Sequence, residues 1–335
     1  MSLIEGYNSK IRQWSAEQDG SDYLTIDRKI QFLSHYLYYD FEPAVGPYPS
    51  FSIRLANWIN NLPNDADQKL LFKLIPRLFY LGRDEFNCLH RTAFNTTLKS
   101  WYFECSNINF ETDSYQDYLS KSIHETWFCP VTDSFRINQF YHLNQITSKH
   151  TFRPDWRSLR QFGDKVRVLD YLKRNGVKFL VLLEDFVGSG SQVKKTLEFA
   201  CELLACPEAV ELGIRILFIP MIICPKGIDT LKELKNKHNS LDFKPVVEIA
   251  NSEIVNEETS QNNSNIGPYV DMIKRSFAKV KGGNPSEELK RIEEFGYKNT
   301  GGLVVMFTNT PNNSLPIIFV ESDSWSPLFK RHFRD

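Results

Sequence analysis

Apolar residues recur every three or four positions along the first 120 residues, which is the spacing of one face of an α-helix. Two such stripes are Ile26, Ile30, Leu33 and Leu37, which follow a candidate N-cap at Thr25, and Leu55, Trp58, Ile59 and Leu62. Further helices are predicted over residues 68–81, with a break at Pro76, and over residues 83–101. Packing in a core accounts for such stripes better than a binding face does. We therefore predict an all-helical cap or docking region over residues 1–120.

After residue 120 the apolar runs become short, β-branched and almost unbroken, as in strands that are covered on both faces. We predict strands over residues 126–131, 179–183, 214–223, 245–249 and 303–308. Helical patterns at residues 192–204 and 227–236 separate several of these runs. This alternation predicts an α/β domain over residues 121–335, with a mainly parallel sheet flanked by helices.

A polar, amide-rich stretch occupies residues 251–266 and contains few residues that can join a core. We predict a loop for this stretch. It is either a solvated connection between a strand and a helix or a lid near the ligand edge of the sheet.

The composition excludes several classes of protein. The chain has 40 basic and 41 acidic residues, so no overall field attracts it to nucleic acid or to an anionic membrane. No run approaches the about 20 apolar residues that span a bilayer, and the N-terminus lacks the pattern of a signal peptide. The six cysteines form no C-x-x-C pair, which argues against a zinc or redox motif. We expect a globular, cytoplasmic protein.

The segment FLVLLEDFVGSGSQV, at residues 179–193, combines an apolar strand, two acids, a loop of small residues and a helix. Ligands of open α/β folds bind at the carboxyl ends of parallel strands, where Glu184 and Asp185 are expected. Small residues let backbone N–H groups approach an anion, and the positive end of the following helix adds to the attraction. The segment therefore predicts a site for one phosphate group beside two carboxylates.

Two common nucleotide motifs fit this segment poorly. In a dinucleotide fold the ribose-binding acid follows the glycines by about 20 residues, whereas here two acids precede them. A P-loop requires Lys-Ser or Lys-Thr after its last glycine, but Gly190 is followed by Ser191 and Gln192. A dinucleotide-binding or methyl-donor-binding enzyme remains a third and weaker interpretation.

The order of an apolar strand, Glu-Asp, two spacer residues and Gly-Ser-Gly resembles the phosphoribosyl pyrophosphate (PRPP) motif of type I phosphoribosyltransferases. In that family the two acids hold the ribose hydroxyls and the loop holds the 5′-phosphate. The resemblance implies that Glu184 and Asp185 are the ribose pair. It implies a phosphate loop made of Gly188, Ser189, Gly190, Ser191 and Gln192. Gln192 departs from the hydroxyl residue that is usual at its position.

Two more segments resemble a family of phosphoribosyltransferase-like proteins that is associated with bacterial conflict systems. The first is TWFCPVTDSFRIN at residues 126–138. The resemblance implies a diphosphate loop over residues 130–136, whose polar members Thr132, Asp133, Ser134 and Arg136 face the diphosphate and its Mg²⁺. Asp133 and Asp185 would then act on the metal indirectly, through the diphosphate and the ribose. A polar turn with a surface arginine is an equally good interpretation.

The second segment comprises residues 307–319 and 325–331, and it implies a C-terminal hood from Asn309 to Arg331, called here the hood segment. In phosphoribosyltransferases a variable hood recognises the base. The amides of Asn312 and Asn313 would bind a base edge, and Trp325 or Phe329 would supply a stacking face. The many turn-forming residues also fit a purely structural loop.

Type I enzymes commonly close a basic loop over the diphosphate. Four basic residues lie where such a loop is expected, and they fit a solvated helical face as well: His150, Arg153, Arg157 and Arg160.

The resemblance implies a Mg²⁺-dependent enzyme that transfers or releases a base, with PRPP or a nucleotide as its substrate. It also implies an effector in anti-phage defence of the retron type, whose protein partners would be a reverse transcriptase and a winged-helix protein. The sequence does not fix the oligomeric state; a homodimer is one option, since many type I enzymes are dimers and two-fold assembly is the commonest oligomer. The alternative is a sensor that binds a phosphoribosyl ligand without turnover and signals through the helical N-terminal region.

Overall fold

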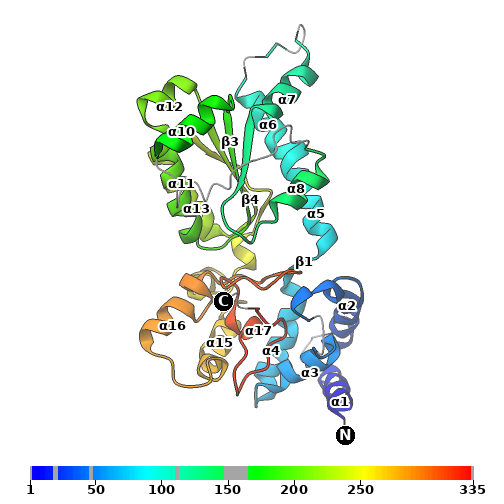
Figure 1. Cartoon of the computed structure of the whole chain (residues 1–335). Helices are drawn as coiled ribbons and strands as arrows, with labels where there is room; N and C mark the ends of the chain where they lie inside the picture. Colours follow the sequence, from blue (N-terminus) through cyan, green and yellow to red (C-terminus); the bar gives the residue numbers. More distant parts are fainter. Residues whose placement is uncertain are drawn as a thin grey trace. The chain divides into compact units, whose positions relative to one another are not determined.

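The computed structural model describes residues 2–17, 22–44, 48–106, 108–109, 113–146 and 165–332. The chain forms two compact units (Figure 1). The terminal unit combines Met1–Glu85 with Ala250–Asp335, and the sheet unit comprises Phe86–Ile249. This division differs from the predicted boundary at residue 120, because the last quarter of the chain packs with the N-terminal helices.

The sheet unit contains a parallel sheet in which strands that follow one another along the chain are neighbours, in the order β2-β3-β4-β5, while β6 also pairs with β4. Its strands are β2 (Thr126–Pro130), β3 (Phe179–Val187), β4 (Arg215–Ile223), β5 (Leu241–Phe243) and β6 (Val247–Glu248). All of these pairings are parallel, which confirms the predicted α/β fold with a mainly parallel sheet.

Helices cover both faces of this sheet (Figure 1). On one face lie α10 (Lys165–Arg174), α11 (Ser191–Leu204), α12 (Pro207–Leu212) and α13 (Pro225–Lys237). On the other lie α5 (Arg83–Thr92), the π-helical segment η4 (Ala93–Leu98), α6 (Lys99–Glu104) and α8 (Ile137–Leu143), with α7 (Tyr115–His124) leading into β2. The strands read as unbroken apolar runs because they are buried on both faces.

Aromatic contacts fix the helices of the second face on the sheet. Trp101 and Tyr102 of α6 pack on Phe179 at the start of β3, with ring centroids 5.5 and 5.0 Å away. Phe140 of α8 packs on Phe128 of β2 at 5.8 Å. The predicted helix over residues 83–101 therefore belongs to this layer, and it continues through η4 into α6.

The terminal unit is mainly helical. Its α-helices are α1 (Leu3–Ser15), α2 (Tyr23–Tyr36), α3 (Phe51–Asn60), α4 (Asp65–Leu74), α14 (Glu257–Asn262), α15 (Gly267–Val280), α16 (Glu287–Glu293) and α17 (Pro316–Phe319), with the short 3₁₀ helices η1 (Tyr38–Asp40), η2 (Glu42–Ala44), η3 (Ile75–Arg77), η5 (Asn251–Glu253) and η6 (Tyr297–Asn299). The second predicted stripe is fully buried on and after α3. The helix break at Pro76 is confirmed, because α4 ends at Leu74.

Two local expectations in this unit are wrong. Asp22 rather than Thr25 caps α2, since the Asp22 carboxylate accepts a hydrogen bond from the Thr25 backbone N–H at 2.8 Å. The stretch over residues 251–266 is not simply a loop, because it contains α14. Asn256 and Thr259 form a capping box there, which outweighs the polar composition.

The predicted strand over residues 303–308 is present but belongs to a different sheet. It forms β7 (Val304–Met306), which pairs in parallel with β1 (Phe79–Leu81) in the terminal unit. The N-terminal region is therefore not entirely helical, and β7 is not a strand of the five-stranded parallel sheet. Within the described ranges, no helix has the length and apolar character that crossing a bilayer requires.

Candidate functional site

The two adjacent acids lie inside β3 rather than after it. The strand runs on to Val187 because its partner β4 runs on to Ile223, and Glu184 pairs in register with Pro220. Only 3% of Glu184 and 5% of Asp185 is exposed. Carboxylates that are buried this deeply need hydrogen-bond donors, and the loop that follows β2 supplies them.

The loop over residues 130–136 contacts Glu184 through one residue. The backbone N–H of Thr132 donates to Oε2 of Glu184 at 3.0 Å, and Oγ1 of Thr132 lies 2.7 Å from Oε1. Both oxygens of the Glu184 carboxyl are therefore engaged by Thr132, which is itself buried.

Ser134 extends this contact to the second acid. Its Oγ lies 2.6 Å from Oγ1 of Thr132 and 3.0 Å from Oδ1 of Asp185. The same Oδ1 accepts the backbone N–H of Phe186 at 2.8 Å. The predicted residues Thr132, Ser134, Glu184 and Asp185 thus form one hydrogen-bonded cluster at the end of β3.

The electrostatics of the acid pair follow from this burial. Removal from water and the adjacent charge of Asp185 raise the pKa of Glu184 well above its ordinary value, although the hydrogen bonds from Thr132 act in the opposite direction. Asp133 adds to the negative potential that Glu184 experiences. Two like charges in such a site oppose each other, so the pair favours a state in which only one acid is ionised.

The loop over residues 188–192 leads directly into α11. Gly190 caps this helix in the left-handed region, with φ at 76°, which a residue with a side chain adopts only at a cost. The hydroxyls of Ser189 and Ser191 lie 3.0 Å apart, and Ser189 is buried. Gln192 is exposed on the first turn of the helix. Backbone N–H groups at such a helix start are ready partners for an anion.

Helix α13, which follows the neighbouring strand β4, packs against the 188–192 loop. Thr230 Oγ1 donates to the Ser189 carbonyl at 3.0 Å, and a Cβ on Gly190 would lie 2.9 Å from Thr230 Cβ. A Cβ on Gly227 would lie 2.8 Å from the Gly188 carbonyl oxygen. The sequence analysis did not identify Gly227 and Thr230. Their position just after β4, at the carboxyl end of a parallel strand, is the signal that could have identified them.

A buried histidine, His90, packs against Phe135 of the 130–136 loop. The ring of His90, which is completely buried, stacks on Phe135 at 5.0 Å and 27°, with Phe86 and Phe140 around it. Neither ring nitrogen has a hydrogen-bond partner, and burial lowers the pKa of His90 to about 4. The imidazole is therefore neutral at pH 7, and its ring packs among the neighbouring phenylalanines as an apolar side chain would. The sequence offered no signal for this role.

The remaining predicted residues of the loop lie at its surface. Asp133 and Arg136 are both exposed, and each takes part in further interactions. Among the described residues, no three His, Cys, Asp or Glu side chains gather closely enough to hold a metal ion. The basic residues His150, Arg153, Arg157 and Arg160 lie outside the described residues.

The predicted base-binding residues lie in the terminal unit. Trp325 and Phe329 are 1% and 0% exposed, so neither ring offers a face to a base in this structure. Trp325 Nε1 donates to the Ile317 carbonyl at 3.0 Å, and the Asn313 amide binds the Tyr297 carbonyl and Thr300 Oγ1. Asn312 is exposed. Packing accounts for the burial of Phe329, because aromatic rings of the N-terminal region surround it.

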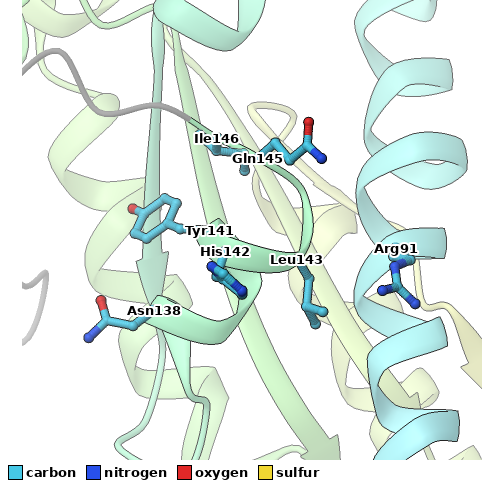
Figure 2. Close-up of a pocket in the computed structure, with 7 residues that line it drawn as sticks. All are labelled: Arg91, Asn138, Tyr141, His142, Leu143, Gln145 and Ile146. Carbon is cyan, nitrogen blue, oxygen red and sulfur yellow. The ribbon is translucent and has the colours of Figure 1, made fainter.

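A separate surface cavity of about 670 Å³ lies beside α8 (Figure 2). Its lining residues are Arg91, Asn138, Tyr141, His142, Leu143, Gln145 and Ile146. Figure 2 shows Leu143 projecting towards α5, which carries Arg91. None of the predicted site residues lines the cavity, so it is distinct from the cluster at the end of β3.

Three comparisons with known proteins were made, and one of them gave a match. Neither the curated proteins nor the solved structures gave a match. A family model described as PRTase-CE matches residues 55–331, which is well over half of the chain and includes the 130–136 loop, the acid pair and the 188–192 loop. The chain therefore belongs to the PRTase-CE family of phosphoribosyltransferase-like proteins.

Proposed function

We propose that the sheet unit binds the phosphoribosyl group of PRPP or of a nucleotide at the carboxyl end of β3, and that it catalyses transfer or release of the base. One observation carries this proposal. The hydroxyls of Thr132 and Ser134 meet the acids Glu184 and Asp185 beside a glycine-rich helix start, although nothing in their sequence separation requires it. Membership of a phosphoribosyltransferase-like family supports the same conclusion.

Reaction at the anomeric carbon of ribose passes through a state with oxocarbenium character, as for other glycosidic bonds. The protein then needs no nucleophilic side chain. Asp185 orients the ribose through its hydroxyls, while the N–H groups at the start of α11 and the hydroxyls of Ser189 and Ser191 hold the 5′-phosphate. Fixing the ribose in this way brings base and anomeric carbon into line.

A Mg²⁺ ion bound with the diphosphate would neutralise the charge of the leaving group. The residues present fit such an ion. Asp133 is exposed on the loop next to the acid pair, and the described residues contain no ready-made cluster of three metal ligands. Mg²⁺ commonly takes one or two carboxylates and completes its shell with phosphate oxygens and water. Asp133 and Asp185 are the residues that would act on it, directly or through water.

The biological setting that we propose is an effector of bacterial anti-phage defence of the retron type, acting in the cytoplasm with a reverse transcriptase and a winged-helix protein as partners. The support is the resemblance of residues 126–138 and of the hood segment to proteins of bacterial conflict systems. An effector that its partners hold inactive would show no turnover alone. Assays therefore need the partners as well as the isolated chain.

The test is release or transfer of base. The full chain is incubated with Mg²⁺ and mixed nucleotides, with and without pyrophosphate, and free bases are followed by chromatography. We expect base release that Asp185→Asn abolishes, because an amide is a poor acceptor for two ribose hydroxyls. Absence of turnover with and without the partner proteins, together with tight binding of PRPP, would replace the enzyme by a phosphoribosyl sensor.

A further inference from the structure

The cavity beside α8 has the size of a site for a small molecule. Its volume of about 670 Å³ falls within the range of about 300–1,000 Å³ that is usual for ligand pockets. Arg91 of α5 lies on one side of it, and residues of α8 and of the turn after α8 line the rest (Figure 2). Neither Glu184 nor Asp185 lines it, so it is separate from the acid pair.

Four of the seven lining residues carry exposed polar side chains that have no hydrogen-bond or ion-pair partner in the described part of the chain. These are Arg91, Asn138, His142 and Gln145. Polar side chains between them on the same helix and turn are engaged: Gln139 donates to Asn87 at 2.6 Å, and Asn144 donates to the His90 carbonyl at 3.3 Å. The free hydrogen-bonding groups of this region are therefore gathered around the cavity.

Gln145 lies where the fold alone favours a different residue. Helix α8 ends in a Schellman motif, in which the Ile146 N–H donates to the Tyr141 carbonyl at 3.0 Å. Gln145 occupies the position of this motif that is usually glycine, with φ at 51° in the left-handed region. Residues with side chains in such a conformation are concentrated at functional sites. Because the Gln145 amide has no partner among the described residues, the helix end does not explain its presence.

The side chains of the lining define the chemistry of a ligand. A guanidinium at Arg91 suits a phosphate, and His142 donates from a ring nitrogen in either protonation state. The amides of Asn138 and Gln145 each donate and accept, which suits the edge of a planar heterocycle. Among the described residues, those that line the cavity include no acid. Apolar surface comes from Tyr141, Leu143 and Ile146.

We propose that this cavity is a second ligand site of the chain and that it binds a nucleoside monophosphate. Arg91 and His142 hold the phosphate, and the amides of Asn138 and Gln145 bind the base. One guanidinium and one imidazole suit a single phosphate group better than a diphosphate. The site goes beyond the proposed function, since it requires neither PRPP nor the acid pair. Helix α8 begins directly after the 130–136 loop, so the ligand would contact the helix that follows this loop.

The first test is isothermal titration calorimetry of the full chain with AMP, GMP, CMP and UMP, each alone. We expect at least one of them to bind, and Arg91→Gln to weaken this binding about tenfold, because a charge-assisted hydrogen bond to the phosphate is lost. Arg174→Gln removes another exposed arginine of the sheet unit and should change the affinity less than about twofold. The corresponding nucleoside, which lacks the phosphate, should not distinguish Arg91→Gln from the wild type.

The second test uses Gln145→Gly, which separates binding from folding. Glycine relieves the left-handed backbone, so this variant should unfold at a higher temperature than the wild type and yet bind the same nucleotide about threefold or more weakly. A weaker affinity in a more stable protein cannot result from misfolding. Lys298→Gly, at φ 55° in the terminal unit, is the matched control and should leave the affinity unchanged. An unchanged affinity in Gln145→Gly would overturn the proposed position of the base.

Asp185→Asn distinguishes the cavity from the proposed phosphoribosyl site. Nucleotide binding that Arg91→Gln weakens and Asp185→Asn preserves would support the cavity site, independently of any result with PRPP. Binding that only Asp185→Asn weakens would indicate a nucleotide at the end of β3, which would overturn the cavity site and support the proposed function. Failure of all four nucleotides to bind would also overturn the cavity site, while titration with PRPP would still test the proposed function.

Discussion

The end of β3 and the hood segment both contain buried polar groups, but the hydrogen-bond partners of these groups differ. At the end of β3, polar side chains contact one another across two loops, as Thr132 and Ser134 do with the acid pair. In the hood segment, most hydrogen bonds of side chains instead involve backbone groups. Arg54, Trp58 and Asn61, which lie on one face of α3 and at its end, donate to the carbonyls of Leu328, Ile317 and Ser326.

This difference is informative because hydrogen bonds between side chains are the rarest class in folded proteins. Side chains that bind backbone groups hold a segment of the chain in place, as Arg54, Trp58 and Asn61 do for the hood segment. The buried cluster at the end of β3 binds the backbone N–H groups of Thr132 and Phe186 and, in addition, joins polar side chains to one another next to a helix start. These additional contacts between side chains distinguish it from the hood segment.

The largest effect is expected from Phe329, whose ring lies 5.2 to 5.9 Å, between centroids, from those of Tyr38, Phe41, Phe51 and Tyr80. Phe329→Ala should lower the free energy of unfolding by about 3–5 kcal/mol in urea titrations. The control Tyr39→Ala removes a ring that is 71% exposed and should cost less than about 0.5 kcal/mol. A variant that loses ligand affinity but no stability would show that Phe329 stacks on a base after all.

Gly190 tests the helix start at the end of β3. Gly190→Ala places a side chain at φ 76° and within 2.9 Å of Thr230 Cβ, whereas Gly213→Ala, at φ 64°, meets nothing within 4 Å. Both variants should lose about 1–2 kcal/mol of stability from the left-handed backbone. Gly190→Ala should lose more than this, and it alone should weaken PRPP binding. Equal losses in the two variants would mean that the close packing of the 188–192 loop on α13 is unimportant.

The pH dependence of stability tests the acid pair. The pKa of Glu184 is raised in the folded state, so its contribution is fully present below the unfolded value of about 4.3 and is lost as the pH rises through the folded value. The free energy of unfolding of the wild type should therefore fall relative to that of Glu184→Gln as the pH rises above about 4.3. Urea unfolding at a series of pH values measures this. A difference that rises with pH would indicate a stabilised carboxylate instead.

Gln192 gives the smallest expected change. It is exposed on the first turn of α11, where the motif usually has a hydroxyl residue. Gln192→Thr should strengthen PRPP binding by about 0.5–1.5 kcal/mol, the net value of one added hydrogen bond. Calorimetric titration of the two proteins makes the comparison, with Lys195→Thr on the next part of the helix as the control. Weaker binding in Gln192→Thr would show that the glutamine amide itself contacts the ligand.

Local rules predicted much of the fold. The three- and four-residue spacing located α3, and Pro76 ended the preceding helix as expected. The strands β2, β3 and β4 were visible as apolar runs because both faces of their sheet are buried. In contrast, β1 and β5 contain three residues each, and β1 forms only because β7, more than 200 positions later, pairs with it. No local pattern reports such a partner.

The candidate site likewise contains some features that the sequence predicted and others that it did not. The acid pair was recognisable because two charged residues follow an apolar run, and Gly190 because its left-handed backbone favours glycine. Sequence alone did not reveal that Thr132 would engage both oxygens of Glu184, or that β3 would extend to Val187, since both depend on neighbouring strands. The burial of Trp325 was equally hidden, because its cover comes from residues that lie far away in sequence.

The most direct test of the central claim is calorimetric titration of PRPP with Mg²⁺ into the wild-type chain, Asp185→Asn and the control Gly213→Ala. We predict binding by the wild type and by Gly213→Ala with equal affinity, and at least about tenfold weaker binding by Asp185→Asn, because an ionised acceptor is replaced by an amide. Equal affinity of Asp185→Asn and the wild type would contradict a phosphoribosyl site at the end of β3.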